Sequence, residues 1–173
     1  MRPALFALHG LDLELAEIVA GTTEPMIGQI RLAWWREALT GLDAGVVPAQ
    51  PLLQAIAAEL LPRGITGAML AVLEDRWLPM IGADGLPPAH VEGGAAFFAL
   101  AARLLGGNDT LGERLGRAWV LGDGAGLPPM PAALRPLLGL VRLAERDRRR
   151  ERADPPGGLA RQWLMFRTIA LGR

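Results

Sequence analysis

The sequence contains no cysteine, no lysine and no tyrosine. The absence of cysteine excludes disulfide bonds and thiolate chemistry. The absence of lysine excludes a Schiff-base amine and a phosphate-loop lysine, and the absence of tyrosine excludes a catalytic phenol. No apolar run reaches the roughly 18 to 20 residues that a membrane-spanning helix requires.

The chain also lacks an excess of charge of either sign, because 18 basic residues balance 18 acidic ones. A balanced charge creates no long-range field that attracts nucleic acid, so nucleic acid is not an expected partner. The 173 residues, about half of them hydrophobic, suffice for one sizeable core. We therefore expect a single domain over residues 1–173 of a soluble, cytoplasmic protein. Peripheral contact with the inner face of a membrane stays open.

Signals for β-strands are nearly absent, because β-branched residues are scattered and do not alternate with polar ones. Apolar residues instead recur at spacings of three and four along the whole chain, which is typical of helices. The pattern predicts an all-α domain with helices at 4–20, 24–41, 51–61, 66–78, 88–106, 110–122, 131–151 and 157–170. Clusters rich in glycine and proline separate them, among them 83–88, 122–131 and 154–158.

The first predicted helix carries two glutamates in an unusual position. Glu14 and Glu17 lie three residues apart, on one side of the helix and between two apolar stripes. Asp12 points roughly the other way. The glutamates mark either a solvated edge of a buried helix or a carboxylate pair that faces a cavity and could hold a divalent cation.

The second predicted helix carries an arginine between two apolar stripes. Arg31 lies one turn before Trp35 and is surrounded by Trp and Ile residues. Because an unpaired buried charge is costly, we expect Arg31 to stack on Trp35 or to pair with Glu14 or Glu17 across a helical hairpin. A structural salt bridge and a site for an anion both agree with this pattern.

Three other features carry weaker signals. His9 and His90 have no companion at metal-ligand spacing, so we expect each to be structural or exposed. The glycines of 122–126 follow no strand, which argues against a phosphate loop. The charged run 145–152 is typical of a solvated helix end, with attachment to an anionic membrane surface as the alternative.

Two segments resemble a known family. Ala4–Leu39, most strongly its part Glu24–Leu39 (EPMIGQIRLAWWREAL), and Leu111–Leu121 (LGERLGRAWVL) are similar to helices of the squalene/phytoene synthase family. The members of this family are all-α enzymes that join two isoprenyl diphosphates head to head. The first segment is particularly similar to the divergent branch that includes a mitochondrial complex I assembly factor. The resemblance spans residues 4–122 and implies a helical isoprenoid-synthase-like bundle, shortened relative to the family.

The family holds Mg²⁺ and a diphosphate between two acidic clusters. The resemblance places the first cluster at Leu13, Glu14 and Glu17. It places Asp123 in the second cluster, as the remaining candidate metal ligand. Arg31 is the candidate diphosphate ligand. At four further positions this chain has a residue that lacks the functional group of the family residue. Gly10 stands where the family has an arginine, Val120 where it has a glutamine, and Leu127 and Pro131 where it has aspartates.

These departures favour a degenerate protein that has lost catalysis. It would bind an isoprenoid or another lipid, or a protein partner as an assembly or scaffold factor. The alternative is a working Mg²⁺-dependent prenyltransferase of the squalene/phytoene type. There Glu14, Glu17 and Asp123 hold the metal and Arg31 the diphosphate. If residues 131–170 leave the helical shell open, an exposed apolar patch should favour self-association or membrane contact.

Overall fold

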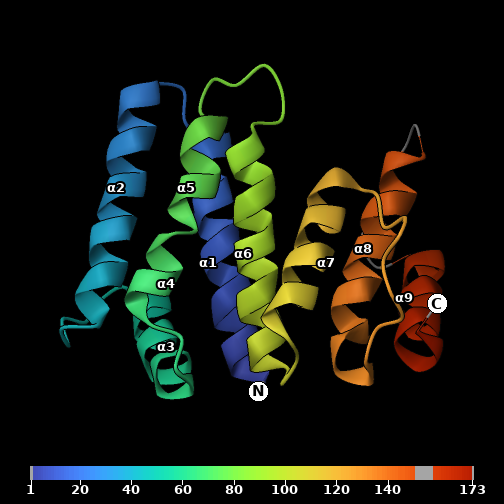
Figure 1. Cartoon of the computed structure of the whole chain (residues 1–173). Helices are drawn as coiled ribbons and strands as arrows, with labels where there is room; N and C mark the ends of the chain where they lie inside the picture. Colours follow the sequence, from blue (N-terminus) through green and yellow to red (C-terminus); the bar gives the residue numbers. More distant parts are fainter. Residues whose placement is uncertain (1, 151–157, 173) are drawn as a thin grey trace. The chain divides into compact units, whose positions relative to one another are not determined.

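The computed structural model describes residues 2–150 and 158–172, and every regular element in these ranges is helical (Figure 1). The helices are α1 Arg2–Ala20, α2 Pro25–Leu42, α3 Pro51–Glu59, α4 Gly67–Ala71, α5 Glu74–Trp77, α6 Pro88–Leu104, α7 Asp109–Leu121, α8 Arg135–Arg148 and α9 Leu159–Leu171. Short 3₁₀ turns lie at Leu61–Arg63, Leu78–Met80 and Ala132–Leu134. The predicted all-α class is confirmed.

Most predicted helices begin and end within two residues of the observed ones. The helix predicted at 66–78 is wrong in one respect, because α4 and α5 are separate helices on either side of Val72 and Leu73. The helix predicted at 131–151 begins with a 3₁₀ turn, and α8 starts only at Arg135. Apart from Gly158, the break predicted at 154–158 lies outside the described residues, as do positions 151 and 152 of the charged run.

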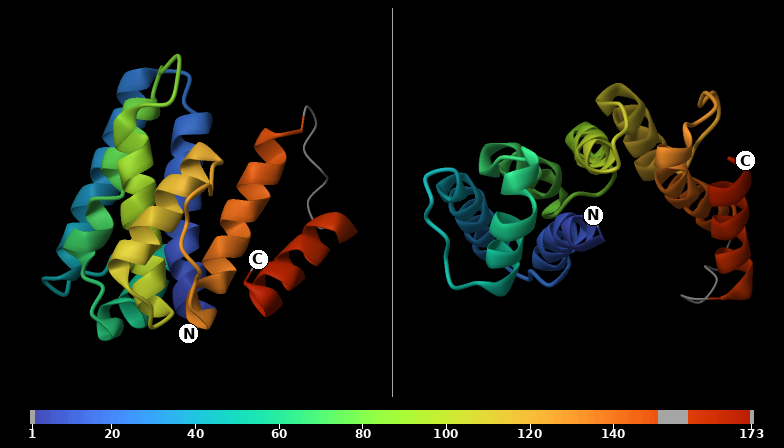
Figure 2. Two further views of the ribbon diagram at one scale, coloured as in Figure 1. Left: turned by 45° about the vertical axis from the view of Figure 1, so that its right-hand side comes forward. Right: turned by 90° about the horizontal axis from the view of Figure 1, so that it is seen from below.

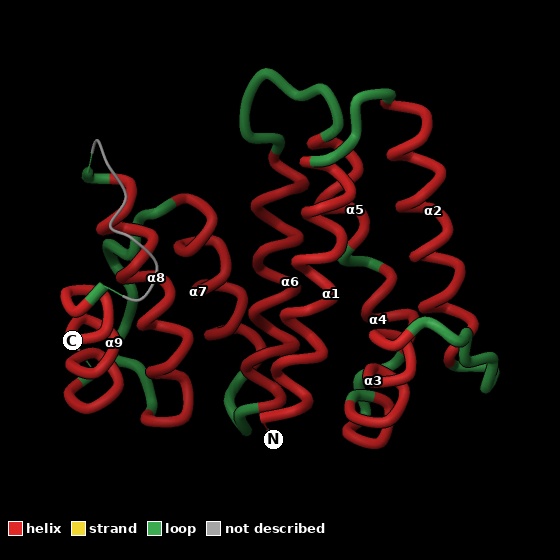
Figure 3. Tube along the Cα trace, turned by 180° about the vertical axis from the view of Figure 1, so that it is seen from behind, coloured by secondary structure: helices red, strands yellow, loops and turns green. Residues whose placement is uncertain are grey.

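The chain divides into two compact units, Met1–Gly93 and Gly94–Arg173, and the boundary falls within α6. In the first unit, α1 and α2 form an antiparallel hairpin, with α3 at the end opposite its connecting turn (Figure 3). One of the two apolar stripes of α1, formed by Leu8, Leu11, Leu15 and Ile18, is fully buried. Helix α3 packs on α1, and α4 packs on α2.

Helix α2 buries only one of its two apolar stripes. Leu32, Trp35 and Leu39 lie in the core. Ile27, Ile30 and Trp34, on the other stripe, are 51%, 62% and 47% exposed. Arg36 connects α2 to α5 through hydrogen bonds. Its Nε donates to Glu74 Oε2 at 2.8 Å, and its Nη2 donates to the carboxylates of Glu74 and Asp75. The first unit therefore presents an uncovered apolar strip along α2.

In the second unit, the C-terminal part of α6 packs closely against α7. A Cβ added at Gly116 would lie 2.2 Å from the carbonyl oxygen of Gly94, so glycine permits this helix crossing. The ring of Phe98 stacks on that of Trp119, with 5.0 Å between centroids. Helix α8 packs on α7, and α9 lies alongside α8 (Figure 2). In the described ranges, no helix has both the length and the apolar character needed to cross a membrane.

Candidate functional site

A pocket of about 420 Å³ opens beside the exposed strip of α2. Its lining residues come from α1, from α2 and from the residue before α3: Glu14, Ile30, Arg31, Trp34, Trp35 and Gln50. The Trp34 and Trp35 rings meet edge to face with 5.4 Å between centroids, which fixes one apolar wall. The Gln50 side chain is held by the N-terminus of α3, where it accepts a hydrogen bond from Leu53 N at 2.7 Å.

Trp34 also lines a second pocket, of about 410 Å³, further along α2. The other residues of that pocket are Glu37, Ala38, Gly41, Val46 and Pro48. We call the two pockets together the Trp34 groove. Its lining combines apolar side chains, among them Ile30, Trp34 and Val46, with the charged side chains of Glu14, Arg31 and Glu37.

The structure brings two of the predicted site residues, Glu14 and Arg31, to one pocket. The expected ion pair of Arg31 with Glu14 or Glu17 is not formed, and the Arg31 side chain makes no hydrogen bond or ion pair with any described residue. The physical reason is exposure: Arg31 lies on the outer side of α2, where water solvates its charge and no partner is needed. Glu17 is exposed and does not line the pocket.

Asp12 is a buried carboxylate of the first unit that accepts hydrogen bonds from two side chains. Arg76 Nη1 donates to both carboxylate oxygens of Asp12, at 3.1 and 3.3 Å, and Trp77 Nε1 donates to Oδ1 at 3.0 Å. The guanidinium of Arg76 also lies over the Trp77 ring, 4.7 Å from its centroid, as a cation–π contact. Asp12, Arg76 and His90 are all buried. This cluster holds α1, α5 and the start of α6 together.

His90 completes the buried cluster as a neutral side chain. Its Nδ1 donates to the Arg76 carbonyl oxygen at 3.1 Å, which leaves Nε2 as an acceptor 3.4 Å from Arg76 Nη2. Burial lowers the pKa of His90, and the nearby charge of Arg76 lowers it further. Burial also lowers the pKa of Arg76, against the opposing effect of Asp12. The expectation that His90 is structural agrees with this position.

The lowered pKa of His90 predicts an acid-sensitive fold. Below its ordinary value of 6.5, the unfolded chain binds a proton that the folded chain rejects. The free energy of unfolding should therefore decrease as the pH falls from about 7 to about 5. His90→Asn, which keeps a donor near Nδ1 and leaves Asp12 and Arg76 in place, should flatten this decrease. Urea denaturation at several pH values measures it. The control His9→Asn should keep the wild-type slope, and equal slopes for both variants would contradict the prediction.

Asp123 belongs to the second unit, whereas Glu14 and Glu17 belong to the first. Asp123 is exposed in the loop after α7, where its Oδ1 accepts a hydrogen bond from Ala125 N at 2.9 Å. Within the described ranges, no group of three or more histidine, aspartate or glutamate side chains is placed to hold a metal ion. Leu13, at the head of the first acidic cluster, is exposed and offers no ligand atom.

Sequence reasoning missed Arg76 and Trp77 entirely and gave Asp12 no role. Arg76 and Asp12 are 64 positions apart, so no local spacing connects them. One signal was present: Arg76 and Trp77 stand in the mostly apolar stretch Ala68–Ile81, where a charge is expected to find a partner.

In the described residues all regular structure is helical, and a groove lined by apolar and charged side chains lies on the N-terminal hairpin. The sequence model of the family described as squalene/phytoene synthase matches residues 1–73, so this segment of the chain is similar to that family. The matched segment includes α1, α2 and the Trp34 groove. No curated protein and no solved structure gives a significant match to the chain.

Proposed function

We propose that this protein is a non-catalytic, degenerate relative of squalene/phytoene synthases that binds an isoprenoid-type amphiphile in the Trp34 groove. One observation carries the proposal: the same pocket joins an apolar wall of Ile30, Trp34 and Trp35 to the exposed guanidinium of Arg31, which pairs with no described residue. An isoprenyl diphosphate has the matching parts, since its hydrocarbon chain suits the wall and its anionic head suits the arginine.

The acidic side chains of α1 support the loss of catalysis. Asp12 is buried, and Arg76 and Trp77 donate hydrogen bonds to its carboxylate. Glu14 and Glu17 remain, and of these two only Glu14 lines the pocket. The family holds Mg²⁺ between acidic clusters on facing helices, and the residues that line this pocket offer no second carboxylate opposite Glu14. These residues do not fit a family-type Mg²⁺ site in the first unit.

The length of the groove also supports a protein partner, the assembly or scaffold role that the divergent branch suggests by analogy. The groove extends from Ile30 past Trp34 to Val46, and the exposed side chains of Met26 and Ile27 continue the apolar strip toward the start of α2. A strip of this length suits the apolar face of a partner helix.

The alternative, a Mg²⁺-dependent prenyltransferase, is favoured by one arrangement. Glu14 and Arg31, which the family resemblance assigns to metal and diphosphate, line one pocket. In that reading the pocket would orient the diphosphate and exclude water from the apolar chain.

Farnesyl diphosphate tests the proposal by calorimetric titration with and without Mg²⁺. We expect binding without turnover, and we expect Arg31→Gln or Trp34→Ala to weaken it by about tenfold or more, because a charged contact or an apolar wall is lost. Arg63→Gln, an exposed arginine away from the groove, is the matched control.

Each outcome separates the readings. Diphosphate release that Glu17→Ala abolishes would establish the prenyltransferase and reject the non-catalytic proposal. Binding that survives both groove variants would reject the Trp34 groove as its site. Absence of binding would reject the isoprenoid ligand and leave the protein partner, for which the exposed strip of α2 is the surface to test.

A further inference from the structure

Helix α9 in the second unit presents an apolar, aromatic face to solvent. Leu159, Trp163 and Phe166 are 84%, 65% and 63% exposed. At about 100° per residue these three side chains fall within a sector of about 60°. Their opposite face packs on α8, where Thr168 is buried and Met165 contacts Gly139. The Trp163 and Phe166 rings stack with 5.8 Å between centroids, so they form one continuous aromatic surface.

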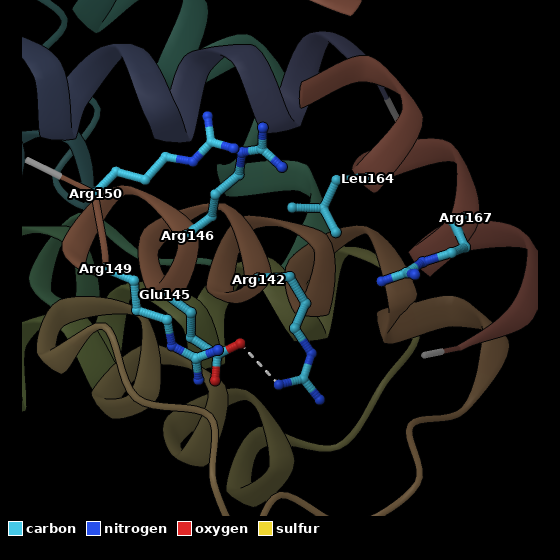
Figure 4. A pocket seen from close by; sticks show the side chains of 7 residues that line it. All are labelled: Arg142, Glu145, Arg146, Arg149, Arg150, Leu164 and Arg167. Carbon is cyan, nitrogen blue, oxygen red and sulfur yellow. Dashed lines mark hydrogen bonds and ion pairs between the residues drawn. The ribbon is translucent and has the colours of Figure 1, made fainter. Parts of the chain in front are cut away.

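A positively charged pocket of about 300 Å³ lies between α8 and α9 (Figure 4). Its lining residues are Arg142, Glu145, Arg146, Arg149, Arg150, Leu164 and Arg167. The only carboxylate among them, Glu145, accepts hydrogen bonds from Arg142 Nη1 at 2.8 Å and from Gly124 N at 2.7 Å. Arg149 and Arg167 are exposed, and their side chains make no hydrogen bond or ion pair with described residues. Arg149 and Arg167 therefore contribute positive charge to the pocket that no described carboxylate neutralises, in a chain of zero net charge.

Arg167 connects the two features. It follows Trp163 by four residues, so it lies about 40° around α9 from the aromatic face. It also lines the positive pocket together with Leu164. The arginines thus border the apolar face along one flank of the helix. This combination, aromatic and aliphatic side chains flanked by arginines, is typical of helices that lie in a membrane interface.

We propose that α9 and the arginine pocket together form a docking surface for an anionic lipid bilayer. Leu159, Trp163 and Phe166 enter the boundary between headgroups and acyl chains, and Arg149 and Arg167 bind lipid phosphates. The charge of the pocket favours an anionic surface, and the apolar face beside it favours one that also offers hydrocarbon. Since each signal alone gives weak attachment, both are needed for stable, reversible binding. The inference is independent of the proposed function, which rests on residues of the first unit.

Co-sedimentation with vesicles tests the proposal on the full chain. Vesicles of phosphatidylcholine alone are compared with vesicles that also contain phosphatidylglycerol. We expect binding only to the anionic vesicles, and we expect added salt to weaken it. The paired substitutions Trp163→Ser with Phe166→Ser, and separately Arg149→Gln with Arg167→Gln, should each lower the partition coefficient by about tenfold or more.

Matched controls come from exposed residues of the first unit. Leu86→Ser removes an exposed apolar side chain and Arg63→Gln an exposed positive charge, and both should leave vesicle binding unchanged. Far-UV circular dichroism verifies that every variant folds, as expected for substitutions at exposed positions. Because Trp34→Ala changes the Trp34 groove and not α9, it should also bind vesicles normally, which separates this inference from the proposed function.

Three results would overturn the proposal. The first is a wild-type chain that ignores anionic vesicles, and the second is equal binding to neutral and anionic ones. The third is a dimer in sedimentation velocity that Trp163→Ser with Phe166→Ser dissociates while vesicle binding is absent. That result would assign the aromatic face of α9 to a second copy of the chain.

Discussion

Replacing Arg76 with leucine should lower the free energy of unfolding by about 3 to 5 kcal/mol, the usual loss when one partner of a buried ion pair is removed. In the variant, the buried carboxylate of Asp12 keeps only the Trp77 Nε1 hydrogen bond at 3.0 Å. The cation–π contact with Trp77 disappears as well. Urea denaturation followed by far-UV circular dichroism measures the loss.

Two further variants show whether the loss comes from the orphaned charge. The double variant Asp12→Leu with Arg76→Leu removes both charges, so it should recover part of the lost stability. Arg103→Leu, which breaks the exposed pair with Asp109, should cost less than about 1 kcal/mol. If Arg76→Leu costs no more than Arg103→Leu, the cluster is not a buried structural element.

The sequence predicted the helices well because their ends carry strong local signals. Pro25, Pro51 and Pro88 each begin a helix, as proline does when its missing N–H falls in the first turn. Gly122, in the left-handed conformation with φ 58°, ends α7 within the cluster predicted as a break. The split between α4 and α5 carries no such signal, because Val72 and Leu73 continue the apolar spacing of three and four.

The orientation of α2 could not be predicted from its own residues. Its two stripes, one with Ile27, Ile30 and Trp34 and the other with Leu32, Trp35 and Leu39, are about equally apolar. Only packing against α1, α4 and α5 determines which stripe is buried. The expected pairing of Arg31 was wrong because it assumed that both stripes were covered.

Some residues of the candidate site could be predicted from the local sequence pattern, and others could be found only from the tertiary fold. Glu14 and Arg31 were found because each is a charge between apolar stripes on one helix, which is a local pattern. The contact of Asp12 with Arg76 and of Arg76 with His90 joins three helices, so it depends on the tertiary fold. The assignment of Glu14, Glu17 and Asp123 to one metal site stays a prediction, and so does a single domain over residues 1–173.

Replacing Gly67 with alanine should destabilise the first unit by about 3 kcal/mol, at the upper end of the usual cost of overpacking. An added Cβ would lie 1.9 Å from the carbonyl oxygen of Leu39, a backbone atom of α2 that no rotamer change can move. Helix α4 would have to shift, which strains the hydrogen bonds that Gly67 N and Ala68 N donate to Asp43 at 2.6 and 2.9 Å. Alanine is the better helix former by about 1 kcal/mol, so a loss of stability opposes the intrinsic preference and identifies the steric cause.

The matched control is Gly85→Ala, in the loop before α6, where an added Cβ meets nothing within 4 Å. It should change the free energy of unfolding by less than about 0.5 kcal/mol, as an unhindered surface substitution does. Urea denaturation measures the free energy of unfolding of both variants under the same conditions. Trp34→Ala, which changes an exposed side chain of the groove, is measured with them and should unfold like the wild type. If Gly67→Ala is as stable as Gly85→Ala, α4 does not approach α2 closely enough to hold the inner stripe of α2 in the core. Close packing of α4 would then no longer explain why the stripe with Ile27, Ile30 and Trp34 is exposed. A loosely held α2 could turn either stripe toward the core, and the Trp34 groove would not be a fixed feature.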